Sequence, residues 1–104
     1  MADDPDDVPE LDEFGLLRHH GDWVALSPLQ EGVMRRLLAH FGSPVGRRKL
    51  TEELWPEAPS SRTIDTHMLR LRLRIAPLGL FIHTIRGRGF LLAPAQPRTT
   101  EARN

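Results

Sequence analysis

Arginine is the residue type in this chain that is best suited to binding a charged ligand, and it is concentrated in two short segments. Arg70, Arg72 and Arg74 alternate with leucines, and Arg86 and Arg88 alternate with glycines. A guanidinium group forms two parallel hydrogen bonds with a phosphate, or with the O6 and N7 atoms of guanine. The two segments therefore indicate nucleic acid as a ligand. A solvated face on an ordinary helix is the alternative interpretation of a charge run taken alone.

The distribution of charge along the chain points in the same direction. The 104 residues carry 14 basic and 14 acidic side chains, so the net charge is zero. Residues 1–22 carry a net charge of −7, however, and residues 23–104 carry +7. Residues 60–92 hold six arginines and one aspartate. An acidic leader followed by a basic body indicates a protein that binds nucleic acid.

Residues that would carry catalysis or bind a metal do not occur in a recognised pattern. The chain has no cysteine, which excludes a disulfide framework, a thiolate zinc site and a thiol nucleophile. It shows no Ser/His/Asp order, phosphate-binding glycine loop or paired-carboxylate motif. His19 and His20 are adjacent on a predicted turn, where we expect them to point apart, and no third ligand stands nearby. We therefore predict a protein that is not an enzyme and uses no metal or cofactor.

The N-terminal part is expected to hold an acidic leader and a β-hairpin. Residues 1–10 combine Asp and Pro with too little apolar surface to be buried, so we expect disorder there and in the polar tail 95–104. Between them, residues 11–94 are long enough for one domain with a single core. Phe14–Arg18 and Trp23–Leu26 are short apolar runs that predict two antiparallel strands.

Two helices are predicted next. Ser27 is an N-cap residue and Gln30 stands three positions later, which is the capping-box pattern. The helix that begins there is expected to end at Gly42. Arg47–Trp55 predicts a short second helix, and Pro56 stops it.

Residues 61–76 satisfy two patterns at once. Leucine and arginine alternate with the period of a strand, but apolar residues also recur at i, i+4, i+7 and i+11 from Ile64. Because Leu, Arg and Met are strong helix formers and no β-branched residue lies between Met68 and Arg74, we predict a helix. Its outward side then carries Arg62, Thr66, Leu69, Arg70 and Leu73, flanked by Arg72 and Arg74.

A second hairpin closes the domain. Leu80–Ile85 and Phe90–Ala93 read as strands, and residues 86–89 supply two glycines for the turn. The order is strand, strand, three helices, strand, strand. This predicts an α+β fold, a winged helix-turn-helix with short N-terminal antiparallel strands and a C-terminal β-hairpin wing. The third helix of such a fold fits the major groove of DNA, and the wing tip reaches the minor groove or a phosphate.

Two segments carry a family resemblance. Arg62–Met68 (RTIDTHM), followed by Leu71-Arg72, resembles the recognition helix of OmpR/PhoB-type winged-helix transcription regulators. Ile82–Phe90 (IHTIRGRGF) resembles the wing of that family, and the resemblance spans about residues 23–92. It implies that helix 61–76 enters the major groove and that residues 86–89 reach the minor groove. The residues that it assigns to DNA contact are Arg62, His67, Arg70, Arg72, Thr84 and Arg86. The outward side of the helix and the basic turn add further candidates for DNA contact, which are Thr66, Leu69, Leu73, Arg74 and Arg88.

The chain departs from the family pattern in three ways. No receiver domain with a phosphorylatable Asp fits within 104 residues, so we expect a stand-alone DNA-binding domain without phosphorelay control. Two strands, or three with Leu11–Glu13, precede the first helix, where relatives commonly have four. Leu69 and Leu73 occupy outward positions where relatives often place polar residues.

The leading hypothesis is sequence-specific binding of double-stranded DNA by a bacterial transcriptional regulator. The alternative is a protein-interaction module that uses the outward face of Leu69 and Leu73. The resemblance further implies contact with RNA polymerase through loop 56–61 and a dimer on tandem half-sites. No apolar run approaches the ~20 residues of a membrane span, so we expect a cytoplasmic, nucleoid-associated protein without a membrane partner.

Overall fold

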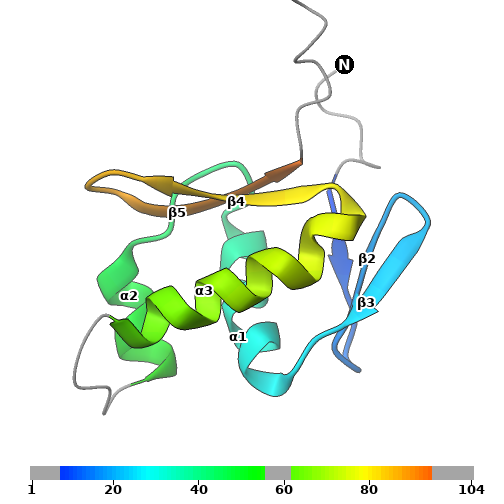
Figure 1. Cartoon of the computed structure of the whole chain (residues 1–104), viewed down its shortest axis with the longest axis horizontal. Helices are drawn as coiled ribbons and strands as arrows, with labels where there is room; N and C mark the ends of the chain where they lie inside the picture. Colours follow the sequence, from blue (N-terminus) through cyan, green and yellow to red (C-terminus); the bar gives the residue numbers. More distant parts are fainter. Residues whose placement is uncertain (1–7, 56–61, 95–104) are drawn as a thin grey trace, which may run out of the picture.

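The structure, a computed structural model, describes residues 8–55 and 62–94, with side chains of the second segment described from residue 64 onward. The predicted α+β order of elements is confirmed. The β2–β3 hairpin lies at one end of the molecule and the tip of the β4–β5 hairpin at the other, with α3 running between them (Figure 1). The elements are β1 (Glu10–Leu11), β2 (Leu16–His19), β3 (Asp22–Ala25), α1 (Pro28–Ala39), α2 (Arg47–Leu54), α3 (Arg62–Ile75), the 3-10 turn η2 (Ala76–Leu78), β4 (Leu80–Ile85) and β5 (Gly89–Pro94).

The N-terminal strands form an antiparallel sheet in the order β1-β2-β3. Leu17 pairs with Val24, and Arg18 pairs with Trp23, so the predicted hairpin is confirmed. His20 and Gly21 close it with φ of 52° and 87°. Two successive positive φ values are what a tight two-residue hairpin turn requires, because they match the twist of the flanking strands.

The predicted boundary of the acidic leader is wrong at its C-terminal end. Glu10 is the first residue of β1 and pairs with Arg18, and Pro9 is buried. Order extends further because the backbone of β1 completes the sheet beside β2 and Leu11 packs against the core. A third strand therefore contributes, at Glu10–Leu11 rather than at 11–13. The leader residues 1–7 and the tail 95–104 lie outside the described residues.

Helix α1 begins as predicted and ends earlier than predicted. The Ser27 side chain accepts a hydrogen bond from the Gln30 N–H, and the Gln30 side chain accepts one from the Ser27 N–H. This capping box satisfies backbone donors that the first turn leaves without a helical partner. The last helical residue is Ala39, three positions before Gly42. Gly42 instead takes φ 83°, and its N–H donates to Leu92 O of β5.

The ambiguous segment 61–76 is a helix, α3, over Arg62–Ile75. Ile64, Met68, Leu71 and Ile75 are each at most 1% exposed, so the i, i+4, i+7, i+11 pattern marks the core face. The alternating Leu-Arg pattern does not produce a strand. Helical geometry buries the whole apolar stripe that begins at Ile64 and leaves the arginines at the surface. Helix α2 packs beside α3, and its only fully buried residue is Leu50.

The wing is a six-residue antiparallel pair, β4–β5, with Ile85 opposite Gly89 across the turn. Val45, from the link between α1 and α2, forms two backbone hydrogen bonds with Phe90, so it lies against β5. A Cβ at Gly89 would stand 2.0 Å from the Val45 oxygen, and Gly89 has φ 116°. Glycine is therefore required where the wing passes the α1–α2 link.

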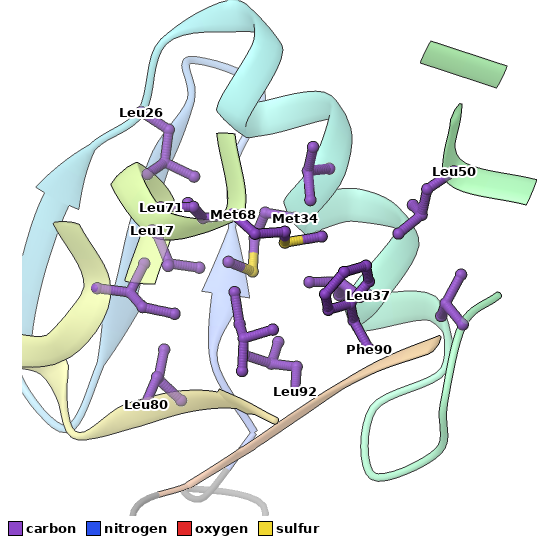
Figure 2. Close-up of a cluster of buried hydrophobic side chains, with 14 of the residues drawn as sticks. Leu17, Leu26, Met34, Leu37, Leu50, Met68, Leu71, Leu80, Phe90 and Leu92 are labelled. Atoms are coloured by element: carbon purple, nitrogen blue, oxygen red, sulfur yellow. The ribbon is translucent and has the colours of Figure 1, made fainter. Parts of the chain in front are cut away.

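One apolar core joins the N-terminal sheet, the helices and the wing. Figure 2 shows Leu17 of β2, Met34 and Leu37 of α1, Met68 of α3 and Phe90 of β5 packed together. All five side chains are at most 3% exposed. Because β5 contributes to the same core as α3, the base of the wing is fixed relative to the third helix.

Candidate nucleic-acid interface

The residues of α3 that the helical periodicity predicts to face outward are exposed wherever their side chains are described. Thr66 and Arg70 are exposed, and Leu69 and Leu73 are 57% and 70% exposed. The opposite side of the helix is fully buried in the core. The side chain of Arg62, which the resemblance also assigned to this face, lies outside the described part of the chain.

Arg72 connects α3 to the wing. Its Nε donates to Ile82 O at 2.8 Å, and its Nη2 donates to Thr84 Oγ1 at 2.7 Å. Its guanidinium also lies 6.0 Å from the centre of the Phe90 ring. Arg72 is half-buried, so these contacts hold it at the base of the wing. The resemblance implied that Arg72 and Thr84 both contact DNA. In the structure their side chains are hydrogen-bonded to each other, and this contact orients the wing relative to α3.

Two other residues that were predicted to contact DNA also make contacts inside the protein. Arg74 Nε donates to Ala25 O at 3.0 Å, which ties the C-terminal part of α3 to β3. His67 is half-buried and stacks on Trp55, with ring centres 5.1 Å apart. Trp55 follows the last residue of α2, so this stack joins the C-terminal end of α2 to the N-terminal half of α3. Both residues stabilise the position of the helix.

The wing tip forms one wall of a cleft of about 600 Å³. The other wall is the start of α2, including Arg47 and Arg48, and none of the described residues that line the cleft is acidic. Arg86 and Arg88 on the wing and Arg48 on α2 are exposed. Gly46, the N-cap of α2, provides no side-chain hydrogen bond, so the first backbone N–H groups of α2 lie open near the cleft. Positive side chains and open helix N–H groups together favour an anionic ligand.

Sequence reasoning missed the contribution of α2. Arg47 Nη1 donates to Asp65 Oδ1 of α3 at 2.8 Å, and the Arg47 guanidinium lies 5.4 Å from the centre of the Phe90 ring. Arg47 and Arg72 therefore both pack on Phe90, whereas Arg48 points its charge at solvent. The basic run at 47–49, directly after Gly46, was the available signal.

Electrostatic partners separate the arginines into two groups. On α1, Arg35 pairs with Glu31 at 2.5 Å and Arg36 pairs with Glu53 at 2.7 Å. Within residues 8–55 and 64–94, four arginine side chains take part in no ion pair or hydrogen bond: Arg48, Arg70, Arg86 and Arg88. The unpaired group belongs to α3, the wing and the adjoining start of α2.

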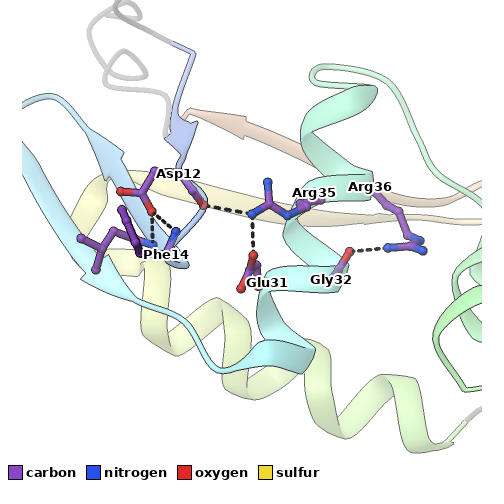
Figure 3. Close-up of polar contacts among 7 residues, drawn as sticks. Asp12, Phe14, Glu31, Gly32, Arg35 and Arg36 are labelled. Atoms are coloured by element: carbon purple, nitrogen blue, oxygen red, sulfur yellow. Dashed lines mark hydrogen bonds and ion pairs between the residues drawn. The ribbon is translucent and has the colours of Figure 1, made fainter.

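Arg35, one of the paired arginines, belongs to a polar network between the link from β1 to β2 and helix α1 (Figure 3). Asp12 Oδ1 accepts hydrogen bonds from the N–H groups of Leu16 at 3.0 Å and Phe14 at 2.8 Å, and Arg35 Nη2 donates to the Asp12 backbone oxygen at 2.9 Å. The Leu16 N–H is the main cause that holds the pKa of the Asp12 carboxyl below its usual range, with further contributions from Phe14 N–H and Arg18. This network fixes the sheet to α1.

The expected orientation of the histidine pair is wrong. His19 and His20 stack with ring centres 3.9 Å apart, because His20 has φ of 52° and turns its ring back toward its neighbour. His19 is 3% exposed, and its Nδ1 lies 2.6 Å from Leu78 O. In the part of the chain that the structure describes, no group of three metal-ligating side chains occurs.

Among the described residues, no helix is both long enough and apolar enough to cross a bilayer.

Comparison with known proteins relates this geometry to a family. The family described as "Transcriptional regulatory protein, C terminal" matches residues 21–92. Protein PetR of Rhodobacter capsulatus is 36% identical over 81 residues, which cover 68% of this chain and 34% of PetR. The chain spans about a third of the length of the curated relatives that it matches.

Solved structures share the fold. The C-terminal domain of the nisin resistance regulator NsrR is 36% identical, has a TM-score of 0.70, and aligns over 82% of this chain and 90% of that domain. The Klebsiella pneumoniae RstA DNA-binding domain, solved in complex with the RstA box, is 26% identical with a TM-score of 0.66. That alignment covers 84% of this chain and 92% of the RstA domain.

Proposed function

The chain belongs to the family of transcriptional regulatory protein C-terminal domains, and on that premise we propose that it binds duplex DNA sequence-specifically to regulate transcription. The family is one of transcription factors and not of enzymes. In this proposal α3 lies in the major groove and the wing tip, residues 86–89, lies at the minor groove. The observation that carries the proposal is the group of exposed arginines without partners on α3, the wing and the start of α2.

Each of these residues has a distinct proposed role. Arg70 stands on the outward face of α3 and contacts a base edge, since a guanidinium forms two hydrogen bonds with guanine. Arg86 enters the minor groove, where a narrow A·T-rich groove concentrates negative potential. Arg88 and Arg48 border the cleft beside the wing and bind phosphates. Arg62 and Thr66, near the start of α3, contact the DNA backbone.

Four further residues that were predicted to contact DNA have a positioning role in this proposal. Arg72 and Thr84 hold the wing against α3, and Arg74 holds α3 against β3. His67 braces α3 against Trp55. Their positions decide the angle between the helix and the wing, and therefore whether both reach DNA together.

From the same resemblance we propose a protein partner, an arrangement on DNA and a location in the cell. The loop 56–61, which lies outside the described residues, contacts RNA polymerase. Two copies of the domain bind tandem half-sites, and the protein is associated with the nucleoid. The alternative function, a protein-interaction module built on Leu69 and Leu73, is not favoured, because the family and the neighbouring structures are those of DNA-binding regulators.

In vitro selection of duplexes from a random pool tests this function. We expect enrichment of a defined motif, with an affinity that falls steeply as salt concentration rises. The selected sequences also report the half-site spacing. Retention of random duplexes without an enriched motif would contradict sequence-specific binding, and failure to retain any duplex at low salt would contradict DNA binding itself.

A further inference from the structure

Two leucines on the outward face of α3 have no role in the core. Leu69 and Leu73 are 57% and 70% exposed. The core face of the same helix is already complete, since Ile64, Met68, Leu71 and Ile75 are each at most 1% exposed. Leu69 and Leu73 stand four residues apart, so they lie one above the other on one side of the helix.

Two of the arginines that neighbour these leucines on α3 donate hydrogen bonds within the protein. Arg72 donates to Ile82 O, and Arg74 donates to Ala25 O. Arg70 is the one cation of the described α3 residues that has no partner within the protein. Among the side chains of the outward face that the structure describes, the unpartnered guanidinium of Arg70 therefore lies with the Thr66 hydroxyl and the two leucines.

We propose that Leu69 and Leu73 read thymine by contact with its 5-methyl group in the major groove. This inference rests on the proposed DNA-binding function. The thymine methyl is the apolar group that the bases display in the major groove, and apolar side chains discriminate thymine by touching it. Four helical residues rise about 6 Å, and two base-pair steps span about 6.8 Å at ~3.4 Å per step. The two leucines therefore match two thymines two base pairs apart, with a guanine for Arg70 in the same half-site.

The surroundings favour DNA over a protein partner for this face. Arg70 lies between the two leucines in the sequence, and Arg72 links their helix to the wing with its exposed Arg86 and Arg88. A stable protein interface buries ~800 Å² on each partner, which is several times what two leucine side chains expose. The isolated apolar pair within a basic surface is the pattern expected for direct base readout.

Replacement of thymine by deoxyuridine tests the inference, because it removes the methyl group and leaves the base-pairing edge unchanged. Each thymine of the selected half-site is replaced in turn, and the Kd is measured by fluorescence anisotropy. We expect about a four-fold weaker Kd at each of two positions, from the free energy of burying one methyl-sized group. Replacement of thymines outside the half-site, and of those facing the wing, leaves Kd unchanged.

Variants assign each methyl to its side chain. Leu69→Ala should abolish the sensitivity to deoxyuridine at one position, and Leu73→Ala should abolish it at the other. Phe14→Ala is the matched control, since Phe14 is 79% exposed but lies between β1 and β2, and it should keep both sensitivities. Because both leucines are exposed, the Tm of each variant should equal that of the wild type.

The failures are distinguishable. Equal Kd for thymine and deoxyuridine at every position, with tight binding retained, overturns the leucine assignment and leaves the proposed function intact. Sensitivity that survives in both leucine variants overturns it as well. Dissociation of a wild-type dimer by the double change Leu69→Lys and Leu73→Lys, with thymine readout unchanged, would show that a second copy covers this face instead. Failure of the wild type to bind any duplex overturns the proposed function and the inference together.

Discussion

The arginines of α1 and those of α3 and the wing differ in what surrounds them. Arg35 and Arg36 each pair with a glutamate, from the same helix or from α2. Arg70, Arg86 and Arg88 are exposed and pair with no acid among the described residues. Clustered charge without partners is unfavourable for folding but lowers the cost of binding an anion, since no internal ion pair has to break. Arginine content alone therefore does not distinguish the two surfaces, whereas the absence of acidic partners does.

The largest expected effect separates Arg70 from Arg35. Arg70→Ala should lose ~1–3 kcal/mol of binding free energy on the selected site and accept any base at one position. Arg35→Ala should leave DNA affinity unchanged, because Arg35 contacts Glu31 and the Asp12 backbone. Competition titrations with single-base variants of the site measure both effects. Equal weakening of all sequences by Arg70→Ala would instead make Arg70 a phosphate contact.

The wing is expected to show the next largest effect. Arg86→Ala should cost about 1.5 kcal/mol, the contribution of a charged hydrogen bond. The loss should be greatest when the bases opposite the wing are A·T-rich, because a narrow minor groove attracts a guanidinium most strongly. Electrophoretic mobility shifts with A·T-rich and G·C-rich flanks give the comparison, and Arg36→Ala is the matched control on the paired surface. An affinity that Arg86→Ala does not change at moderate salt would refute the wing assignment.

Arg72 differs from the unpaired arginines beside it, because its guanidinium donates hydrogen bonds within the protein. Arg72→Ala removes the hydrogen bonds to Ile82 O and Thr84 Oγ1, and should lower stability by about 1 kcal/mol. For a domain of this size the Tm should fall by about 4–8 °C. The salt slope of DNA binding should stay the same, since no phosphate contact is lost. A slope reduced by about one, with an unchanged Tm, would contradict the positioning role.

The smallest expected effect concerns Asp12, on the paired side. Backbone N–H groups and Arg18 hold the pKa of its carboxyl below the ordinary value of 3.8. A carboxyl with a lowered folded-state pKa contributes stability above the unfolded-state pKa and loses it as pH falls through the folded-state value. Wild type should therefore be slightly more stable than Asp12→Asn at pH 7, and the difference should shrink below about pH 4. Urea unfolding across pH 3–7 measures it, and a constant difference would show that ionisation of Asp12 does not matter.

Much of the fold could be predicted from the sequence, because its signals are local. The capping box at Ser27 and the apolar stripe from Ile64 to Ile75 each lie within one helix, so periodicity and capping rules find them. The start of β1 was misjudged, because Glu10 is ordered by pairing with Arg18 and not by its own neighbours. The stacked His19 and His20 depend on the positive φ of His20, a backbone conformation that is uncommon for residues other than glycine.

The site was predicted less completely, because its geometry depends on contacts between elements. The role of Arg72 follows from Ile82 and Thr84, which are ten and twelve positions away. Arg48 lies in the cleft because the wing approaches the start of α2, and the order of elements along the chain does not show this approach. The residue types were therefore enough to predict an interface with DNA. The hydrogen-bond and ion-pair partners of each arginine, which only the structure gives, separate the proposed contact residues from the positioning residues.

The salt dependence of binding to a random duplex measures how many of the exposed, unpaired arginines contact DNA phosphates. The logarithm of affinity should fall linearly with the logarithm of salt concentration, with a slope of about −4.5 if Arg48, Arg62, Arg70, Arg86 and Arg88 each neutralise a phosphate in non-specific binding. Joint replacement of Arg86 and Arg88 by alanine should bring the slope to about −2.7, and joint replacement of Arg35 and Arg36 should leave it unchanged. A slope that both double variants reduce equally, or an affinity that salt does not change, would contradict the account.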